Sequence, residues 1–272
     1  MKTLSKKSSS PKSGKKDKPV ISQQHRQDTI VKLIQDESFV SIDYLVKYFL
    51  VTPQTIRRDL TTLAKANKIQ RHHGGAGVSS SVENNPYQDR KIMNLEAKDK
   101  IAKKLVTLIP DGSSLFINIG TTNEAVARAL VNHKNLHIVT NNLHVAAILS
   151  PKADFTVIIA AGEIRYKDGG IVGDATRDFI EQFRMDFGVI GISGIHSDGS
   201  LLDFDYREVR VARSIIQHSS QTILAADHSK FGRNAMVSMG NISEVEHLVT
   251  DRRPPEEFCA YMNEYGVHLH IA

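Results

Sequence analysis

The stretch VTPQTIRRDLTTL, residues 51–63, determines how the first part of this chain folds. Thr52 can cap a helix by accepting an N–H of the first turn, and Pro53 suits the first helical position because its missing N–H costs nothing there. Apolar residues then recur at helical spacing. They are Ile56, Leu60 and Leu63. The stretch therefore predicts a short helix that packs inward along one stripe.

The opposite face of this helix carries side chains that can read DNA. Gln54, Arg58 and Thr61 lie nearly opposite the apolar stripe, and Thr55 and Arg57 flank it. Gln and Arg pair bidentately with adenine and guanine edges in the major groove. The alternative is an ordinary surface helix whose arginines contact only water. The neighbouring sequence is needed to choose between these two interpretations.

The neighbouring sequence favours a winged helix-turn-helix. A helix is predicted over residues 22–35, and Ser41 is a good N-cap for a second helix that leads into the 51–63 stretch. KIQRHHGGAGV, residues 68–78, predicts two short strands around a glycine turn, which form a wing. His72 and His73 are adjacent on a strand and point to opposite faces, so no metal site is predicted. The predicted DNA-binding residues are Thr52, Gln54, Thr55, Arg57, Arg58, Thr61, Arg71 and His72.

Charge is concentrated at the N-terminus. Residues 1–20 carry seven lysines against Asp17, whereas the net charge of the whole chain is +5, which leaves about −1 for the remainder. This Lys-, Ser- and Pro-rich tail has almost nothing to bury and is expected to be disordered. It is either a solvated tail or a basic arm that adds non-specific phosphate contacts.

The rest of the composition indicates a protein that acts in a reducing compartment. The single cysteine, Cys259, excludes an internal disulfide framework, which fits the cytoplasm. No apolar run is long enough to span a membrane, and the basic N-terminus is not followed by the apolar segment of a secretory signal. We therefore expect no membrane partner.

The second part of the chain alternates apolar runs with helical patterns. The runs lie at 114–119, 136–140, 155–161, 187–192, 222–227 and 247–250, and a final helix (256–264) and strand (266–272) follow. This alternation predicts an α/β domain with a mostly parallel sheet. The predicted organisation is a tail (1–20), a DNA-binding domain (21–78), a linker (79–95) and a sensor domain (96–272). Arg90 and Lys91 of the linker could serve either domain.

The loops that follow these predicted strands are rich in small hydroxyl and amide residues. Parallel α/β sheets bind ligands at the carboxyl ends of their strands, and a helix N-terminus there suits an anion. No glycine-rich nucleotide fingerprint is present, so a small phosphorylated ligand is predicted, with Lys230 neutralising its charge. The predicted effector-binding residues are Gly120, Thr121, Thr122, Thr140, Asn141, Asn142, Glu163, Asp205 and Lys230.

Two other classes of function compete with a ligand-controlled DNA-binding protein. The acidic residues Glu163, Asp203, Asp205 and Glu208 could include a base for a phosphosugar isomerase with an appended DNA-binding domain. A ligand-controlled DNA-binding protein, however, has to bind its ligand but not to convert it. We therefore predict no enzymatic activity, no cofactor and no metal. A non-specific architectural DNA protein is favoured by the basic tail alone.

Sequence motifs in both parts resemble the DeoR family of bacterial repressors. They are Arg26, TPQTIRRDL and RHHGGA in the first part, and IGTTNEAVARAL, VTNNLHVA and DHSKFGRNAMVSMG in the second, so the resemblance spans about residues 23–250. It is nearest to members that repress glycerol and glycerol-phosphate catabolic operons. It implies a sensor domain similar to ribose-5-phosphate isomerase, operator DNA as partner, glycerol 3-phosphate as inducer, and a homo-oligomer (dimer or tetramer). Asn118 stands where many members carry Asp, and the basic tail has no counterpart.

Overall fold

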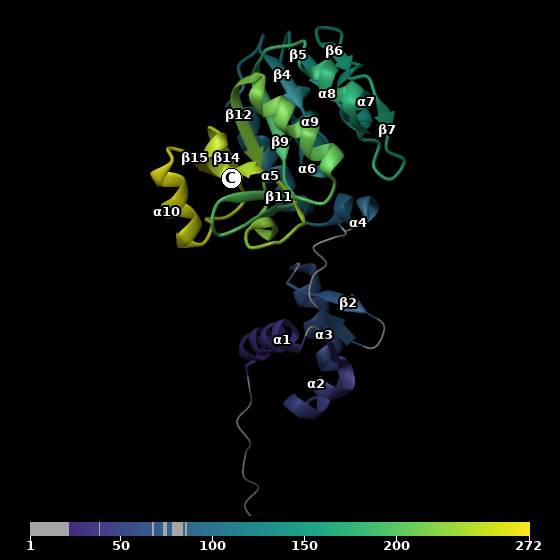
Figure 1. Cartoon of the computed structure of the whole chain (residues 1–272), viewed down its shortest axis with the longest axis vertical. Coiled ribbons are helices and arrows are strands. Elements are labelled where there is room, and N and C mark those ends of the chain that lie inside the picture. Colours follow the sequence, from purple (N-terminus) through teal and green to yellow (C-terminus); the bar gives the residue numbers. More distant parts are fainter. Residues whose placement is uncertain (1–21, 38, 67, 73–74, 78–83, 85) are drawn as a thin grey trace, which may run out of the picture.

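The computed structural model describes residues 22–37, 39–66, 68–72, 75–77, 84 and 86–272 (Figure 1). The predicted basic tail, the tip of the wing and most of the first half of the predicted linker lie outside these residues.

The first part is a small three-helix unit with a three-stranded antiparallel sheet. Its elements are α1 (Gln23–Glu37), β1 (Phe39–Ser41), α2 (Ile42–Phe49), α3 (Pro53–Lys65), β2 (Gln70–His72) and β3 (Gly75–Gly77), with strand order β1-β3-β2. The helix-turn-helix and the strand pair after it are as predicted. Strand β1 was not predicted, because three residues are too few to show a period of two.

Capping residues set the helix starts in this unit. The Ser41 hydroxyl accepts from the Tyr44 N–H at 3.1 Å, and the Thr52 hydroxyl accepts from the Thr55 N–H at 3.2 Å. Between α2 and α3 the chain reverses at Leu50, whose φ of 54° is left-handed. That conformation costs a non-glycine residue about 1–2 kcal/mol, so packing of α2 on α3 has to hold the turn.

A buried ion pair ties α1 to α3. Arg26 Nε donates to Asp59 Oδ2 at 2.5 Å, and Gln27 Nε2 donates to Asp59 Oδ1 at 3.0 Å. Asp59 is only 1% exposed and lies beside the apolar cluster that includes Ile56 and Leu60. Because both carboxylate oxygens are bonded, the charge is compensated although it is buried.

The second part is built on a seven-stranded sheet in which every pairing is parallel. Its order is β15 (His268–Ile271), β14 (His247–Thr250), β12 (Ser219–Ala225), β9 (Met185–Gly191), β4 (Ser114–Ile117), β5 (His137–Thr140) and β6 (Thr156–Ile159). From β4 the chain adds strands outward to β5 and β6, then returns to the other side of β4 with β9 and continues outward from there. The order therefore reverses between β4 and β9, which is the switch point where such sheets bind ligands.

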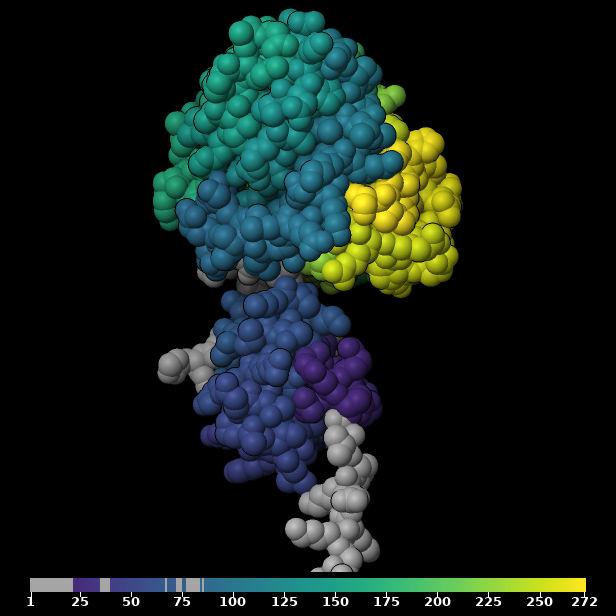
Figure 2. Space-filling model, turned by 180° about the vertical axis from the view of Figure 1, so that it is seen from behind, coloured from purple at the N-terminus to yellow at the C-terminus, as the bar shows by residue number. Residues whose placement is uncertain are grey.

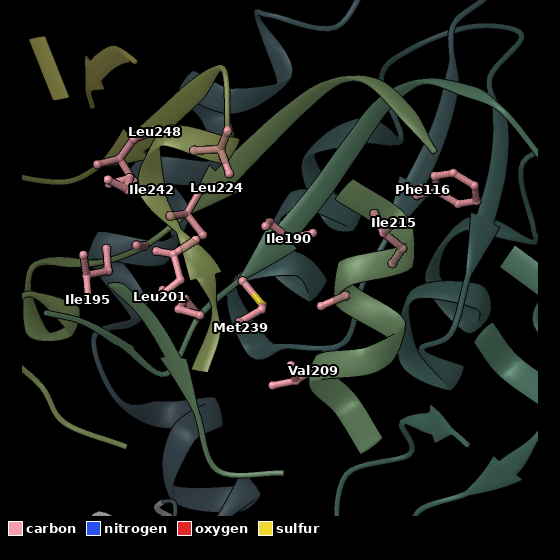
Figure 3. Close-up of a cluster of buried hydrophobic side chains, with 14 of the residues drawn as sticks. Phe116, Ile190, Ile195, Leu201, Val209, Ile215, Leu224, Met239, Ile242 and Leu248 are labelled. Atoms are coloured by element: carbon pink, nitrogen blue, oxygen red, sulfur yellow. The ribbon is translucent and has the colours of Figure 1, made fainter. Parts of the chain in front are cut away.

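Helices cover both faces of this sheet. One face packs against α5 (Leu95–Val106), α6 (Thr121–Leu130) and α7 (Leu143–Leu149), and the other against α8 (Asp174–Ile180), α9 (Tyr206–Gln217) and α10 (Glu256–Glu264). Neighbouring residues of one strand serve opposite faces: Phe116 joins the α9 cluster drawn in Figure 3, whereas Leu115 and Ile117 join the α5–α6 cluster. Figure 2 shows the α10 and β15 residues, in yellow, on one flank of this body. The prediction of an α/β domain with a parallel sheet is confirmed.

Short strands that the sequence did not predict extend this body. A hairpin pairs β7 (Glu163–Ile164) with β8 (Ile171–Val172), and a small antiparallel sheet joins β10 (Gly194–Ile195), β11 (Ser200–Asp203) and β13 (Val237–Asn241). The predicted linker contains α4 (Tyr87–Ile92), which packs on α6. Across the described ranges, no helix has the length and apolar character needed to cross a membrane.

Candidate DNA-binding surface and effector pocket

The candidate DNA-binding surface lies on α3 and the adjacent strand β2. Gln54, Arg57, Arg58 and Arg71 are exposed, while Thr55 and Thr61 are half-buried. Arg71 Nη1 donates to the Thr61 hydroxyl at 3.2 Å, so the strand cation is anchored to the helix. The His72 backbone lies in β2, and its side chain is outside the described residues. Seven of the eight predicted side chains are described, and they lie on these two adjacent elements.

Two of the predicted contact residues already have local roles. Thr52 caps α3 and its hydroxyl lies 2.9 Å from that of Thr55. The Thr61 hydroxyl donates to the Arg57 carbonyl at 2.7 Å. Gln54, Arg57 and Arg58 keep their side chains exposed, which is the arrangement that reaching base edges or phosphates requires.

The candidate effector pocket opens at the carboxyl ends of β4, β9 and β12. It is formed by the loops after these three strands, the segment around α4 and α5, the end of β11 and the start of α9. Its lining residues are Asn84, Arg90, Met93, Asn94, Lys98, Ile119, Gly120, Thr121, Thr122, Gly191, Ile192, Ser193, Asp203, Glu208, Ala225, Asp227, Ser229, Lys230 and Arg233. We call this the effector pocket. It lies at the switch point between β4 and β9, as expected for a sheet of this order.

One wall of the effector pocket is the start of α6. Gly120 has a φ of 138°, which favours glycine, and it lets the chain turn from β4 into the helix without a side-chain cap. Asn123 Nδ2 holds this turn by donating to the carbonyls of Asn118 and Ile119, at 3.0 and 3.2 Å. The first-turn N–H groups of a helix are unpaired within the helix and attract anions. Gly120, Thr121 and Thr122 thus lie in the pocket wall.

Four cationic side chains line the effector pocket: Arg90, Lys98, Lys230 and Arg233. Burial lowers the pKa of Lys98 to about 8, and it also lowers the pKa values of Lys230 and Arg233. Arg233 is held by bonds to the Ser193 carbonyl and to Asn84 Oδ1, at 3.1 and 2.9 Å. Buried cations of this kind bind an anionic ligand strongly, because the ligand restores the stabilisation that water would have given.

Three carboxylates complete the pocket wall. Burial raises the pKa of Asp203, although the Ser193 hydroxyl and the Phe204 N–H donate to it. Burial and the nearby Asp203 raise the pKa of Glu208 to about 7. Burial would also raise the pKa of Asp227, but Lys230 and the bonds from Ser229 outweigh it and lower that pKa. The pocket therefore holds four cations against three carboxylates, two of which have raised pKa values, and this favours an anion.

The structure does not bring the other predicted effector residues to this pocket. Thr140 donates to the Ile117 carbonyl at 2.6 Å, Asn141 donates to the Ile171 carbonyl at 3.1 Å, and Asn142 caps α7. Glu163 lies on β7 with its side chain 71% exposed. Thr140 ends β5, Asn141 and Asn142 follow it, and Glu163 comes after β6. Both strands lie on the side of β4 away from β9, and therefore away from the switch point. Asp205 lies in an adjoining depression, where its Oδ2 accepts from Arg165 at 2.8 Å.

Several pocket residues were not predicted as effector-binding: Asn84, Arg90, Asn94, Lys98, Ser193, Asp203, Glu208, Asp227, Ser229 and Arg233. The burial of Lys98 could have been predicted from the sequence. Lys98 stands three, four and seven residues before Ile101, Ala102 and Leu105, which is the apolar stripe of α5, so a lysine there is buried. Asn118 is buried and accepts from the Ile119 N–H at 2.8 Å, and it is not part of the lining. Within the described ranges, no group of His, Cys, Asp and Glu is arranged to hold a metal ion.

Both parts of the chain match one family of regulators. The DeoR-like helix-turn-helix domain matches residues 26–82, and the DeoR C-terminal sensor domain matches residues 93–252. Because the sensor match alone spans more than half of the chain, the protein belongs to the DeoR family, whose helix-turn-helix domain is that of a DNA-binding repressor.

Individual relatives agree with this membership. A glycerol-3-phosphate regulon repressor of Escherichia coli (strain K12) is 55% identical over 249 residues, which cover 92% of this chain and 99% of the relative. One from Haemophilus influenzae is 51% identical over 90% of this chain and 95% of its own length. Ribose 5-phosphate isomerase A from Neisseria gonorrhoeae is 15% identical, with a TM-score of 0.37 over 49% of this chain and 52% of its own, which carries no argument about activity. The relatives are repressors, and the isomerase alternative is not favoured.

Proposed function

We propose that this protein represses glycerol and glycerol 3-phosphate catabolic operons and is released from its operator by glycerol 3-phosphate. The relatives at 51–55% identity carry the name glycerol-3-phosphate regulon repressor, and this chain covers nearly their whole length. The observation that carries the proposal is the effector pocket, in which four cations and a helix N-terminus converge at the sheet's switch point. A phosphate dianion suits this charge arrangement.

The pocket residues have distinct roles in this proposal. The α6 N-terminus, at Gly120, Thr121 and Thr122, binds the phosphate, and Lys230 neutralises it. Buried Asp203 and Asp227 accept hydrogen bonds from the glycerol hydroxyls. Glycerol 3-phosphate can weaken operator binding only by its differential affinity for the DNA-free conformation, and the operator must then weaken effector binding by the same factor.

We also propose that the protein binds operator DNA as a homo-oligomer in the cytoplasm. Helix-turn-helix proteins reach specific affinity by placing two recognition helices on repeated half-sites about one helical turn apart. Light scattering of the purified protein, alone and on operator, tests this. A monomer that protects a single half-site would contradict it.

The test of the effector uses an operator selected by the protein from random-sequence DNA. The labelled complex is titrated with glycerol 3-phosphate, ribose 5-phosphate, fructose 6-phosphate, glycerol and inorganic phosphate. We expect release by glycerol 3-phosphate at a concentration at which the others have no effect. Release by another phosphosugar alone would leave the family membership intact and refute this effector.

A substitution in the pocket tests the role of Lys230. Lys230→Met removes the charge and keeps much of the side-chain volume, so we expect a protein that folds, binds operator and no longer responds to glycerol 3-phosphate. Lys134→Met removes an exposed lysine outside the pocket and should respond as the wild type does. If Lys230→Met releases DNA at the wild-type effector concentration, Lys230 does not bind the effector.

A further inference from the structure

The segment that follows the DNA-binding domain contributes directly to the effector pocket. Asn84, Arg90 of α4, and Met93 and Asn94 beyond it line the pocket, followed by Lys98 of α5. Two of the four pocket cations, Arg90 and Lys98, therefore come from this segment. A ligand in the pocket would therefore contact the segment that joins the DNA-binding domain to the sensor domain.

Arg90 stands between two possible partners. It lines the effector pocket and also the adjoining depression, which contains Asp168. Its Nη2 lies 3.3 Å from Asp168 Oδ2, and its guanidinium lies 5.9 Å from the centre of the Tyr87 ring. One side chain thus reaches both the space where the effector phosphate would bind and a carboxylate outside it.

Asp168 has a second cationic partner besides Arg90. Arg165 donates to both of its oxygens, from Nε at 2.8 Å and from Nη2 at 2.7 Å. The Arg90 bond is the longer one, and a departure of Arg90 leaves Asp168 with a bidentate partner. When Arg90 exchanges partners, Asp168 thus keeps both of its hydrogen bonds to a guanidinium and is not left without a cationic partner, which would be the costly outcome.

The two ends of α4 are held in different ways. At its start, the buried Tyr87 hydroxyl donates to Glu124 of α6 at 3.0 Å, and the Tyr87 ring stacks on His144 with centres 5.3 Å apart. At its end, Lys98 Nζ donates to the Arg90 carbonyl. Lys98 also lines the pocket, so a bound phosphate would compete for Lys98 and for Arg90, two of the groups that hold the end of α4, while the Tyr87 end remains fixed.

We propose that Arg90 is the residue that couples the effector pocket to DNA binding, by exchanging Asp168 for the effector phosphate and moving the end of α4. A guanidinium binds phosphate bidentately through short charge-assisted hydrogen bonds, whereas Arg90 Nη2 lies 3.3 Å from Asp168 Oδ2. The proposal rests on the proposed function, because it takes a phosphorylated effector as given. It adds a positioning role for a residue outside the loops that hold the phosphate.

The first experiment measures the coupling factor, which is the ratio of the effector dissociation constants with and without saturating operator. For the wild type we expect a factor of about 5–150, as is typical of allosteric proteins. In Arg90→Met it should fall close to one, with operator affinity kept. Lys91→Met removes the adjacent cation of α4, which is exposed and lines no part of the pocket, and should keep the wild-type factor.

A second variant tests the exchange from the other side. Asp168→Asn weakens the competing partner of Arg90 while Arg165 keeps Asp205 and Glu208, so operator release should need a several-fold lower glycerol 3-phosphate concentration. This result does not require the effector affinity of Arg90→Met to be measurable. An unchanged or higher release midpoint in Asp168→Asn would overturn the proposal.

A fluorescent reporter follows α4 itself. The chain contains no tryptophan, and Ile92, the last residue of α4, is 71% exposed, so Ile92→Trp gives one emission signal from that end of the helix. Glycerol 3-phosphate should shift this emission, and adding Arg90→Met should abolish the shift. If Arg90→Met keeps both the emission shift and the coupling factor, Arg90 has no coupling role. If no phosphorylated compound releases the wild-type protein from operator, the proposed function fails instead.

Discussion

The DNA-binding surface and the effector pocket both present cations to phosphate groups, but in opposite surroundings. Arg57, Arg58 and Arg71 are exposed on α3 and β2, whereas Lys98 is 5% and Arg233 9% exposed in the pocket. Exposed cations act on a polyanion through counterion release and are screened by salt. Buried cations have lowered pKa values, and neighbouring carboxylates keep them compensated. The first arrangement suits a long ligand bound by many weak contacts, and the second suits one small ligand.

This difference predicts where a single substitution destroys function. In the DNA-binding domain we expect the largest effect from Asp59, the buried carboxylate that ties α1 to α3, and a smaller effect from the exposed arginines of the binding face. Asp59→Ala leaves the Arg26 guanidinium and the Gln27 amide without their partner, so we expect a loss of about 3–5 kcal/mol in the free energy of unfolding of this domain. Urea unfolding followed by circular dichroism measures it. Asp43→Ala, which removes an exposed acid of α2, should change stability by less than about 1 kcal/mol.

A smaller effect is expected from the binding face itself. Arg58→Ala should leave stability unchanged and cost about 1–3 kcal/mol of operator binding, because its exposed side chain reads a base or clamps a phosphate. Competition titrations against operator and random DNA separate the two roles. Lys65→Ala, in the last turn of α3, is the matched control. Equal affinity of Arg58→Ala and wild type on both DNAs would show that Arg58 does not touch DNA.

The pocket should differ from the DNA-binding face in its response to alkaline pH. Lys98 has its pKa lowered to about 8 by burial, and the groups that act on it are Asp227, Lys230, Arg90 and Glu124. A phosphate favours its charged form, so effector binding above pH 8 must take up a proton. Glu208, whose pKa burial raises to about 7, gains its negative charge in the same range. We expect effector affinity to decline gradually from pH 7 to 8 and then to fall by up to about tenfold per pH unit.

Calorimetry across this pH range checks the expectation. Operator affinity should change little over the same interval, because the arginines on α3 and β2 are exposed and neither element includes a buried lysine. Lys98→Met should bind glycerol 3-phosphate more weakly and without the decline above pH 8. A decline that persists in Lys98→Met would assign the titration to another group.

The recognition helix could be predicted because its signals are local. Thr52, Pro53 and the stripe of Ile56, Leu60 and Leu63 fix its start and its buried face within thirteen residues. The order of the strands is not local. Strand-end loops after β5 and β6 resemble those after β4, β9 and β12 in composition, and only the sheet order shows which of them flank the switch point. Thr140, Asn141, Asn142 and Glu163 were predicted for this reason, and the structure places them elsewhere.

Most charged residues of the pocket could not be predicted from the sequence, for a different reason. Asp203 and Arg233 come from accessory strands and loops too short to carry a period, and Arg90 lies in a segment whose polar composition is typical of linkers. Their burial follows from tertiary packing alone. Lys98 is the exception, because the helical spacing of the apolar residues that follow it is enough to place this lysine on the buried stripe of α5.

The contribution of residues 84–98 to the pocket has a consequence for building hybrid regulators. The sensor-domain match begins at residue 93, which is where a designer would cut to exchange sensors between relatives. A junction there would take Asn84 and Arg90 from one parent and the rest of the ligand-binding wall from the other. A transplanted sensor should keep its own ligand preference only if the junction precedes residue 84, so the exchangeable module is longer than the recognisable domain.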